Sequence, residues 1–249
     1  GQKVSVGPPF FNATFIPIMI PLLLLMAIGP MLSWKQGDLA SAMSRLWVAA
    51  ICSGGLGILF WLLNSDKPFT PIIGFAMAGW LGGGALKELA DRILLFKIPL
   101  LNSLLRARGL PRSAYGMTLA HLGVAIFVCG ASADSAWRSE VVFNAKEKDQ
   151  TEIAGFNLKL QKVERLKGPN YETERAHILV TKDSKIIANL YPERRFYPVQ
   201  QMLTTEATIY STVVADLYAT IGEGDKRNGW VLRIWYNPLI PWIWLGCLL

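Results

Sequence analysis

The chain has 249 residues, of which 52% are hydrophobic and 17% charged, and its mean hydropathy is +0.32. This composition is too apolar for an ordinary soluble domain, and the apolar residues form long runs without charge. The net charge of +7 lies outside residues 134–227, where 14 basic and 14 acidic side chains balance. The excess charge therefore indicates membrane topology and not a nucleic-acid surface.

Four apolar runs are long enough to cross a bilayer as helices, which requires about 20 mostly apolar residues. They cover residues 15–34, 46–63, 69–86 and 115–132, and a shorter run at 238–249 has 12 residues. We therefore predict an extracytoplasmic loop (1–13), four transmembrane helices (14–132), a β domain (133–229), and a return strand that leads into a truncated fifth helix (230–249). Because the sequence begins without Met and ends within an apolar run, we expect it to be part of a longer protein.

Prolines and glycines in the first half of the chain predict different features: the prolines predict a loop and helix kinks, and the glycines predict close packing of helices. Gly7-Pro8-Pro9 predicts a stiff loop, and prolines 17, 21 and 30 predict kinks in the first span. The glycines at 54, 55 and 57, and at 79 and 82–84, favour close helix packing. The alternative to close packing is that these glycines leave a gap between the helices that admits a flat cofactor.

Charge predicts the orientation, because short cytoplasmic loops collect Lys and Arg. The stretch near residues 87–114 carries six basic side chains against Glu88 and Asp91, and the loop after the first span carries Lys35 and Arg45 against Asp38. The loop at Asp66 and Lys67 is neutral. We expect the first two loops in the cytoplasm and the β domain outside, in the periplasm. The mixed segment 92–108 is typical of an interfacial amphipathic stretch.

The external region has alternating or β-branched runs that are separated by turn residues. The predicted strands are 156–163, 176–181, 185–190, 207–210, 213–219 and 230–235, with turns at 168–170, 182–184 and 222–225. These features predict an all-β barrel or sandwich inserted into a polytopic α-helical membrane protein. We interpret residues 192–198 as a charged turn with solvated ion pairs; a docking site for a carboxylate is the alternative. No cysteine lies in this region, so no disulfide framework is predicted.

Two histidines are candidates for chemistry. His121 lies inside the fourth span, where an ionisable side chain is costly to bury and marks a functional site by default. It is either a haem-iron ligand or a neutral histidine that is hydrogen-bonded to a neighbouring helix. Met117 is one turn away on the same helix face, so it cannot be the opposite ligand of the same iron. His177 lies on a predicted strand without Cys or a second His, which favours a structural role.

Motifs along the chain resemble the C-terminal part of the CcmF family of cytochrome c haem lyases. They are Val4-Ser5-Val6-Gly7-Pro8-Pro9-Phe10-Phe11-Asn12, Tyr115-Gly116-Met117, Ala120-His121-Leu122-Gly123, Tyr191-Pro192-Glu193-Arg194-Arg195, Thr205-Glu206, Asp216-Leu217-Tyr218, Asn237-Pro238-Leu239 and Trp242-Ile243-Trp244-Leu245-Gly246. They occur in family order across nearly the whole chain.

The resemblance implies a role in cytochrome c maturation. It implies a bacterial or mitochondrial inner membrane, and a structural haem b with His121 as one axial metal ligand. The second axial histidine would come from the missing N-terminal part or another chain. The implied partners are the rest of the same lyase, the haem chaperone CcmE, CcmH and CcmI, apocytochrome c and membrane lipids, with no nucleic acid. A membrane transporter and a membrane-anchored sensor with a ligand-binding periplasmic domain are the alternatives.

Overall fold

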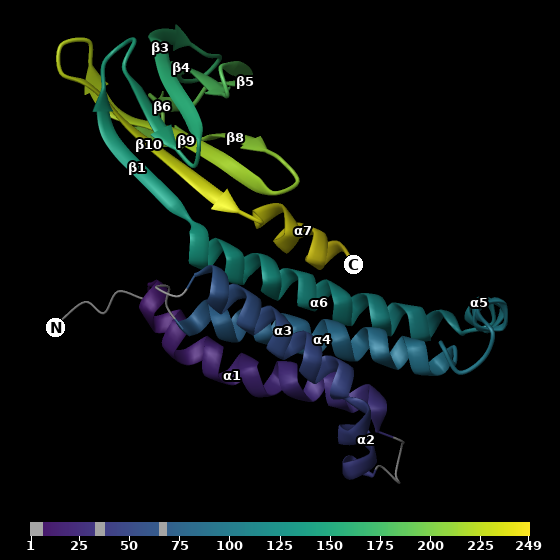
Figure 1. Ribbon diagram of the computed structural model, residues 1–249. Coiled ribbons are helices and arrows are strands. Elements are labelled where there is room, and N and C mark those ends of the chain that lie inside the picture. Colours follow the sequence, from purple (N-terminus) through teal and green to yellow (C-terminus); the bar gives the residue numbers. More distant parts are fainter. Residues whose placement is uncertain (1–6, 33–37, 65–68) are drawn as a thin grey trace. The chain divides into compact units, whose positions relative to one another are not determined.

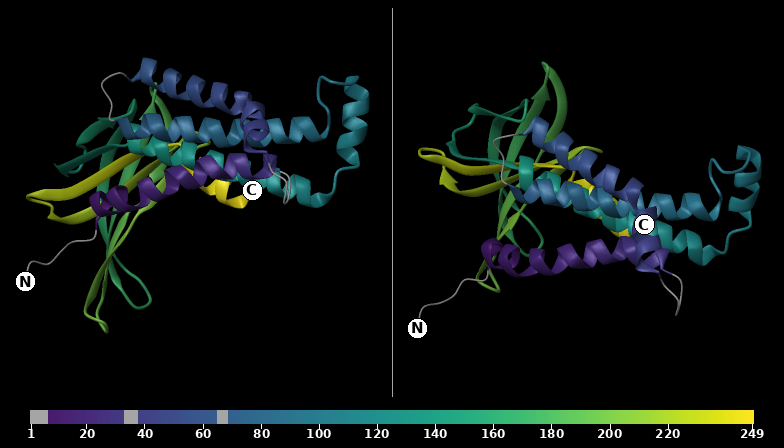
Figure 2. Two further views of the ribbon diagram at one scale, coloured as in Figure 1. Left: turned by 90° about the horizontal axis from the view of Figure 1, so that it is seen from below. Right: turned by 60° about the horizontal axis from the view of Figure 1, so that its bottom comes forward.

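The computed structural model describes residues 7–32, 38–64 and 69–249, and the chain divides into two compact units. The first unit is Gly1–Ser132 with Trp242–Leu249, and the second is Ala133–Pro241. Figures 1 and 2 show the first as helices, of which the long ones run alongside one another, and the second as β-sheets. Expectations for residues 1–6, and for Trp34, Lys35, Asp66 and Lys67, concern positions outside the described residues.

The helical unit is built from apolar helices. The helices are α1 (Pro8–Ile28), η1 (Gly29–Met31), α2 (Leu39–Arg45), α3 (Trp47–Leu63), α4 (Phe69–Arg92), α5 (Leu100–Arg108), α6 (Arg112–Trp137) and α7 (Ile240–Leu248). Three helical stretches among the described residues are long and apolar enough to span a membrane: Phe10–Met31, Phe69–Arg92 and Arg112–Trp137. The apolar helix α3 has 17 residues and is shorter than those three.

Helix α1 begins at Pro8, seven residues before the expected start of the first span. Pro8 and Pro9 occupy the first turn, where the missing N–H groups would have no helical partner and the fixed φ angle suits a helix. Pro17 and Pro21 lie inside the helix, whereas Pro30 falls in the 3₁₀ turn that follows it. Prolines therefore start α1, and the helix continues through two more of them.

Small residues bring α3 and α4 together. A Cβ atom added at Gly83 would lie 3.0 Å from the Cα of Ala49 and 3.0 Å from the Cβ of Cys52. No such neighbour lies within 4 Å of Gly54 or Gly55 in the described structure. The glycines of α4 thus allow close packing, as glycine does at many membrane helix interfaces. Leu23, Leu46 and Leu81 complete the buried core of this unit.

The second unit is an antiparallel sandwich of two sheets. Its strands are β1 (Ser139–Ala145), β2 (Gln150–Ile153), β3 (Phe156–Lys167), β4 (Glu172–Lys182), β5 (Lys185–Leu190), β6 (Glu193–Tyr197), β7 (Met202–Glu206), β8 (Thr208–Ser211), β9 (Ala215–Asp225) and β10 (Gly229–Pro238). One sheet has the order β1-β10-β9-β8, and the other has the order β2-β3-β4-β6-β7 with β5 also paired to β4. Buried apolar side chains of both sheets, including Leu160, Ile178, Leu217 and Ile234, form one core. The predicted combination of helices with a β domain is confirmed.

Two of the turn predictions are wrong. Residues 193–197 form strand β6, which pairs with β4 and β7, instead of a charged turn. Ion pairs of the buried Glu193 take the place of the apolar alternation that marks other strands. Gly222–Asp225 continues strand β9, and the turn follows at 226–228, because β9 pairs with β10 out to Asp225 and Gly229.

Candidate functional site

His121 lies on α6 and is half-buried. Its Nδ1 atom is 2.7 Å from the carbonyl oxygen of Met117, one turn earlier in the same helix. A carbonyl oxygen only accepts hydrogen bonds, so Nδ1 carries a proton in this contact, and in the neutral form of imidazole Nε2 then keeps its lone pair. A histidine whose other nitrogen is hydrogen-bonded in this way has the tautomer and fixed ring that metal ligation requires.

A small gap between three helices adjoins His121. It is lined by Ala27 of α1 and Pro30 of η1, by Gly84, Ala85 and Glu88 of α4, and by Met117, Thr118 and His121 of α6. Its volume is about 10 Å³, close to the minimum for one water molecule. A gap of this size does not hold a macrocycle, so the described helices do not by themselves enclose a haem beside His121. Among the described residues, no three His, Cys, Asp or Glu side chains form a metal cluster.

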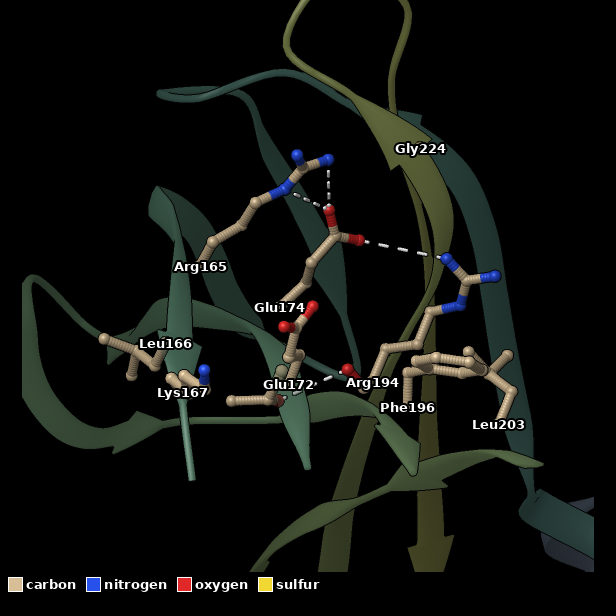
Figure 3. A pocket seen from close by; sticks show the side chains of 10 residues that line it. Arg165, Leu166, Lys167, Glu172, Glu174, Arg194, Phe196, Leu203 and Gly224 are labelled. Carbon is tan, nitrogen blue, oxygen red and sulfur yellow. Dashed lines mark hydrogen bonds and ion pairs between the residues drawn. The ribbon is translucent and has the colours of Figure 1, made fainter. Parts of the chain in front are cut away.

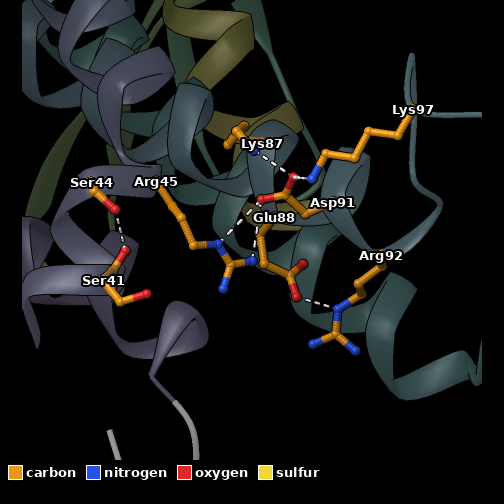
Figure 4. A network of polar contacts seen from close by, with 8 residues as sticks. All are labelled: Ser41, Ser44, Arg45, Lys87, Glu88, Asp91, Arg92 and Lys97. Atoms are coloured by element: carbon orange, nitrogen blue, oxygen red, sulfur yellow. Dashed lines mark hydrogen bonds and ion pairs between the residues drawn. The ribbon is translucent and has the colours of Figure 1, made fainter. Parts of the chain in front are cut away.

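Glu88 is the buried acidic residue in this gap, with 4% of its surface exposed. One carboxylate oxygen, Oε1, pairs with Arg92 one turn later in α4 (Figure 4). The other, Oε2, is buried without a hydrogen-bond partner in the part of the chain that the structure describes. Because the gap has room for about one water, a water bound to Oε2 would satisfy it.

Asp91 gathers three cations at the end of α4. Its carboxylate lies 2.5 Å from Lys87 Nζ, 3.2 Å from Arg45 Nη2 and 3.4 Å from Lys97 Nζ (Figure 4). Arg45 is the last residue of α2, so this ion pair connects α2 to α4. In the sequence, these residues indicate only the topology. The spacings Lys87/Asp91 and Glu88/Arg92, four residues apart, were the signal that could have revealed the pairing.

His177 has partners that explain it without a ligand role. Its Nε2 is 2.8 Å from Asn189 Oδ1, and its ring stacks on Tyr191 with 4.9 Å between centroids. These contacts link β4 to Asn189 in β5 and to Tyr191, which directly follows β5. They match the structural role that its isolation in the sequence favours.

A buried carboxylate holds β4 and β6 together in the sandwich. Glu193 is 5% exposed, and its two oxygens accept hydrogen bonds from Arg175 Nε at 2.5 Å and Arg195 Nε at 2.7 Å. The Thr173 hydroxyl donates a third, at 3.3 Å. Burial acts to raise the pKa of Glu193, but the hydrogen bonds and charges of the two arginines together outweigh burial and hold this pKa below its usual value.

The neighbouring surface has a groove of about 450 Å³ that is lined mainly by β3, β4 and β6 (Figure 3). Glu174 lies at its centre, 2.9 Å from Arg165 and 3.8 Å from Arg194. Arg194 also pairs with Glu223 at 2.6 Å. Because these arginines already have carboxylate partners, the groove carries mixed charge.

Comparison with known proteins places this fold and sequence beside one family. Residues 136–238 match the family described as "CcmF C-terminal beta-sandwich". The chain is 33% identical to the cytochrome c-type biogenesis protein CycK of Bradyrhizobium diazoefficiens over 98% of its length, and 36% identical to ccl1 of Rhodobacter capsulatus over its whole length. It is 32% identical to CcmF of Escherichia coli over 99%. In each case it spans 37% of the relative's length.

A solved structure titled "Cytochrome c Heme Lyase CcmF" has a similar fold, with a TM-score of 0.71. The alignment covers 96% of this chain and 38% of that one, at 21% sequence identity. The likeness supports the arrangement of a helical unit followed by a β-sandwich.

Proposed function

Because this chain belongs to the CcmF family and matches its C-terminal part, we propose that it is part of the membrane haem lyase of cytochrome c maturation. In this role it holds a haem b and helps to attach haem from its chaperone to the thiols of apocytochrome c. The relatives that carry the biogenesis names are longer proteins, of whose length this chain covers 37%. The complete activity is therefore proposed for an assembly of this chain with the rest of the lyase.

The observation that carries the proposal is the hydrogen bond made by the His121 side chain. The hydrogen bond from Nδ1 to the Met117 carbonyl leaves the lone pair of Nε2 available to a metal ion within an apolar helix. Haem iron, when bound, would supply one-electron chemistry for reduction of the transferred haem. His121 would fix one axial position of that iron. The second axial histidine would come from the N-terminal part of the lyase or from another chain.

The proposed setting follows from charge. The basic segment between α4 and α6 would face the cytoplasm, and the β-sandwich would lie on the opposite side of the inner membrane, which in a bacterium is the periplasm. There the sandwich would meet the haem chaperone CcmE, CcmH and CcmI, and apocytochrome c. The charge-mixed groove of β3, β4 and β6 is one surface that such proteins could contact.

The test is the absorption spectrum of the complete lyase with His121→Ala. We expect the substitution to remove or strongly weaken the Soret band of haem b, since it removes one iron–nitrogen bond while alanine preserves the helix. His121→Gly with added imidazole should restore the band in part. His177→Ala is the matched control, and it should leave the spectrum unchanged.

Normal haem content and normal cytochrome assembly in His121→Ala would contradict the site assignment and leave His121 as a packed intramembrane histidine. The same spectrum separates the alternatives. A transporter or a ligand sensor would need no Soret band in the unmodified protein, whereas the lyase requires one.

A further inference from the structure

The turn between β8 and β9 exposes two apolar side chains at one end of the sandwich. Val213 is 77% exposed and Val214 59% exposed. The turn is nevertheless well held: the N–H of Thr212 donates to the carbonyl of Ala215 at 2.9 Å, and the N–H of Leu239 donates to the carbonyl of Val214 at 2.8 Å. The valines are therefore presented by an ordered turn of the sheet.

The chain enters and leaves the sandwich at this same end. Strand β1 begins two residues after α6, and its first residue, Ser139, pairs with Tyr236 of β10. Pro238 at the end of β10 pairs with Ala215 at the start of β9, directly after the turn, and α7 begins at Ile240. Both α6 and α7 are apolar helices. With these helices in the bilayer, as in the proposed function, the short connections from α6 to β1 and from β10 to α7 keep this end of the sandwich near the membrane surface.

A pocket of about 240 Å³ opens beside the turn, between the two sheets. Its walls are mainly apolar and aromatic, with Tyr210, Leu217 and Tyr236 from one sheet and Phe156 from the other. Lys182 is the charged residue in its lining, and its Nζ lies 4.9 Å from the centroid of the Phe156 ring. Among the described residues, no carboxylate pairs with Lys182.

We propose that this end of the sandwich binds an anionic phospholipid of the outer leaflet. The exposed valines insert among the acyl chains, the pocket takes a segment of one chain, and the Lys182 ammonium meets the headgroup phosphate. Interfacial elements combine apolar side chains with lysines in this way, and tyrosines concentrate at the same depth. The pocket is below the usual range for a whole small-molecule ligand, which favours part of a flexible chain.

This inference rests on the membrane placement of the proposed function, so the experiment separates the two. The full chain is reconstituted in phosphatidylglycerol-containing vesicles, in a background of Cys52→Ala, Cys129→Ala and Cys247→Ala. Three single cysteines carry an environment-sensitive fluorophore: Val213→Cys, Val199→Cys and Leu119→Cys. Val199, 87% exposed, is the matched control in the β6–β7 turn, and Leu119 on α6 reports on helix insertion.

Nitroxide groups on the lipid acyl chains should quench most of the emission at positions 119 and 213 and little at position 199. Quenching at 119 with none at 213 overturns this inference alone. Absence of quenching at 119 overturns the membrane placement, and the inference with it.

A second measurement tests the lysine. Native mass spectrometry of the detergent-solubilised full chain should show about fivefold less retained phosphatidylglycerol for Lys182→Glu, the factor expected for one lysine at an anionic surface. Lys182→Arg should retain the lipid. Lys226→Glu makes the same charge change in the β9–β10 turn, at the opposite end of β9 and β10, and should have no effect. Equal loss in Lys182→Glu and Lys226→Glu would overturn the assignment of the headgroup site.

Discussion

Replacing Glu193 with glutamine should destabilise the sandwich by about 2 kcal/mol at neutral pH. Glu193 accepts two hydrogen bonds from arginines, and hydrogen bonds to charged groups are worth about 1.5–3 kcal/mol each. Glutamine keeps one carbonyl acceptor and nearly the same volume, so one bond is lost and the other weakened. The side chains of Arg175 and Arg195 are 39% and 27% exposed, so water partly replaces the lost carboxylate and the cost stays near the lower end.

The cost should depend on pH. Arg175 and Arg195 hold the pKa of Glu193 below its unfolded value of 4.5, despite the opposing effect of burial. A carboxyl group with a lowered folded pKa contributes stability above its unfolded pKa and loses that contribution as pH falls through the folded pKa. The difference between the wild type and Glu193→Gln should therefore be full above pH 5 and shrink as the pH falls below 4.5.

Amide hydrogen exchange of the full chain, read on peptides that cover β4 and β6 and corrected for intrinsic rates, measures this opening free energy. Glu164→Gln is the control, because Glu164 pairs with Lys162 on the exposed surface, and this change should leave protection unchanged. If Glu193→Gln changes protection no more than Glu164→Gln, or if its effect is the same at pH 4 and pH 7, the buried ion pair does not stabilise the sandwich as described.

Two further predictions concern the helices. Phosphatase reporters fused near residue 180 should be active and those near residue 108 inactive, because basic loops remain in the cytoplasm; the opposite pattern would reverse the proposed topology. Gly83→Leu should lower thermal stability in detergent by about 1–3 kcal/mol, because its side chain would overlap Ala49 and Cys52. Gly55→Leu, with open space around it, should cost little, and equal losses would disprove the packing argument.

The strands that could be predicted from the sequence are those marked by apolar alternation in their own residues and by turn residues at their ends. Strand β5 spans the predicted residues 185–190, and β3 begins at the predicted Phe156, because apolar alternation and turn residues mark them locally. Strands β1, β2, β6 and β7 were missed. In β6, Glu193 is buried because it pairs with Arg175 on β4, a partner 18 residues away. A charged residue is ordinarily expected at the surface, so the sequence around Glu193 does not indicate that it is buried. Such a contact has no local signature.

The candidate site shows a similar division. An ionisable residue within an apolar run singled out His121, but the Met117 hydrogen bond that selects its tautomer required the structure. The prolines at positions 8 and 9 predict a loop, whereas they form the first turn of α1, so the predicted start of the helix is too late. Glu88 was read as a loop charge, whereas α4 continues to Arg92 and buries it. The end of an apolar run is therefore a poor guide to the end of a helix. In α4, ion pairs between residues four apart neutralise the charges of the last turns and extend the helix beyond the apolar run.

The position of β1 has a consequence for how the protein is made. In its sheet, β1 pairs with β10 alone, and the residues Ser139 and Tyr236 of that pair are separated by roughly a hundred residues of chain. As the polypeptide is synthesised from its N-terminus, β1 emerges first of all the strands, yet its partner emerges last. Strand β1 must therefore wait with an unpaired edge until almost the whole domain has been delivered. This delay makes β1 the segment most exposed to mispairing or to capture by a chaperone during biogenesis.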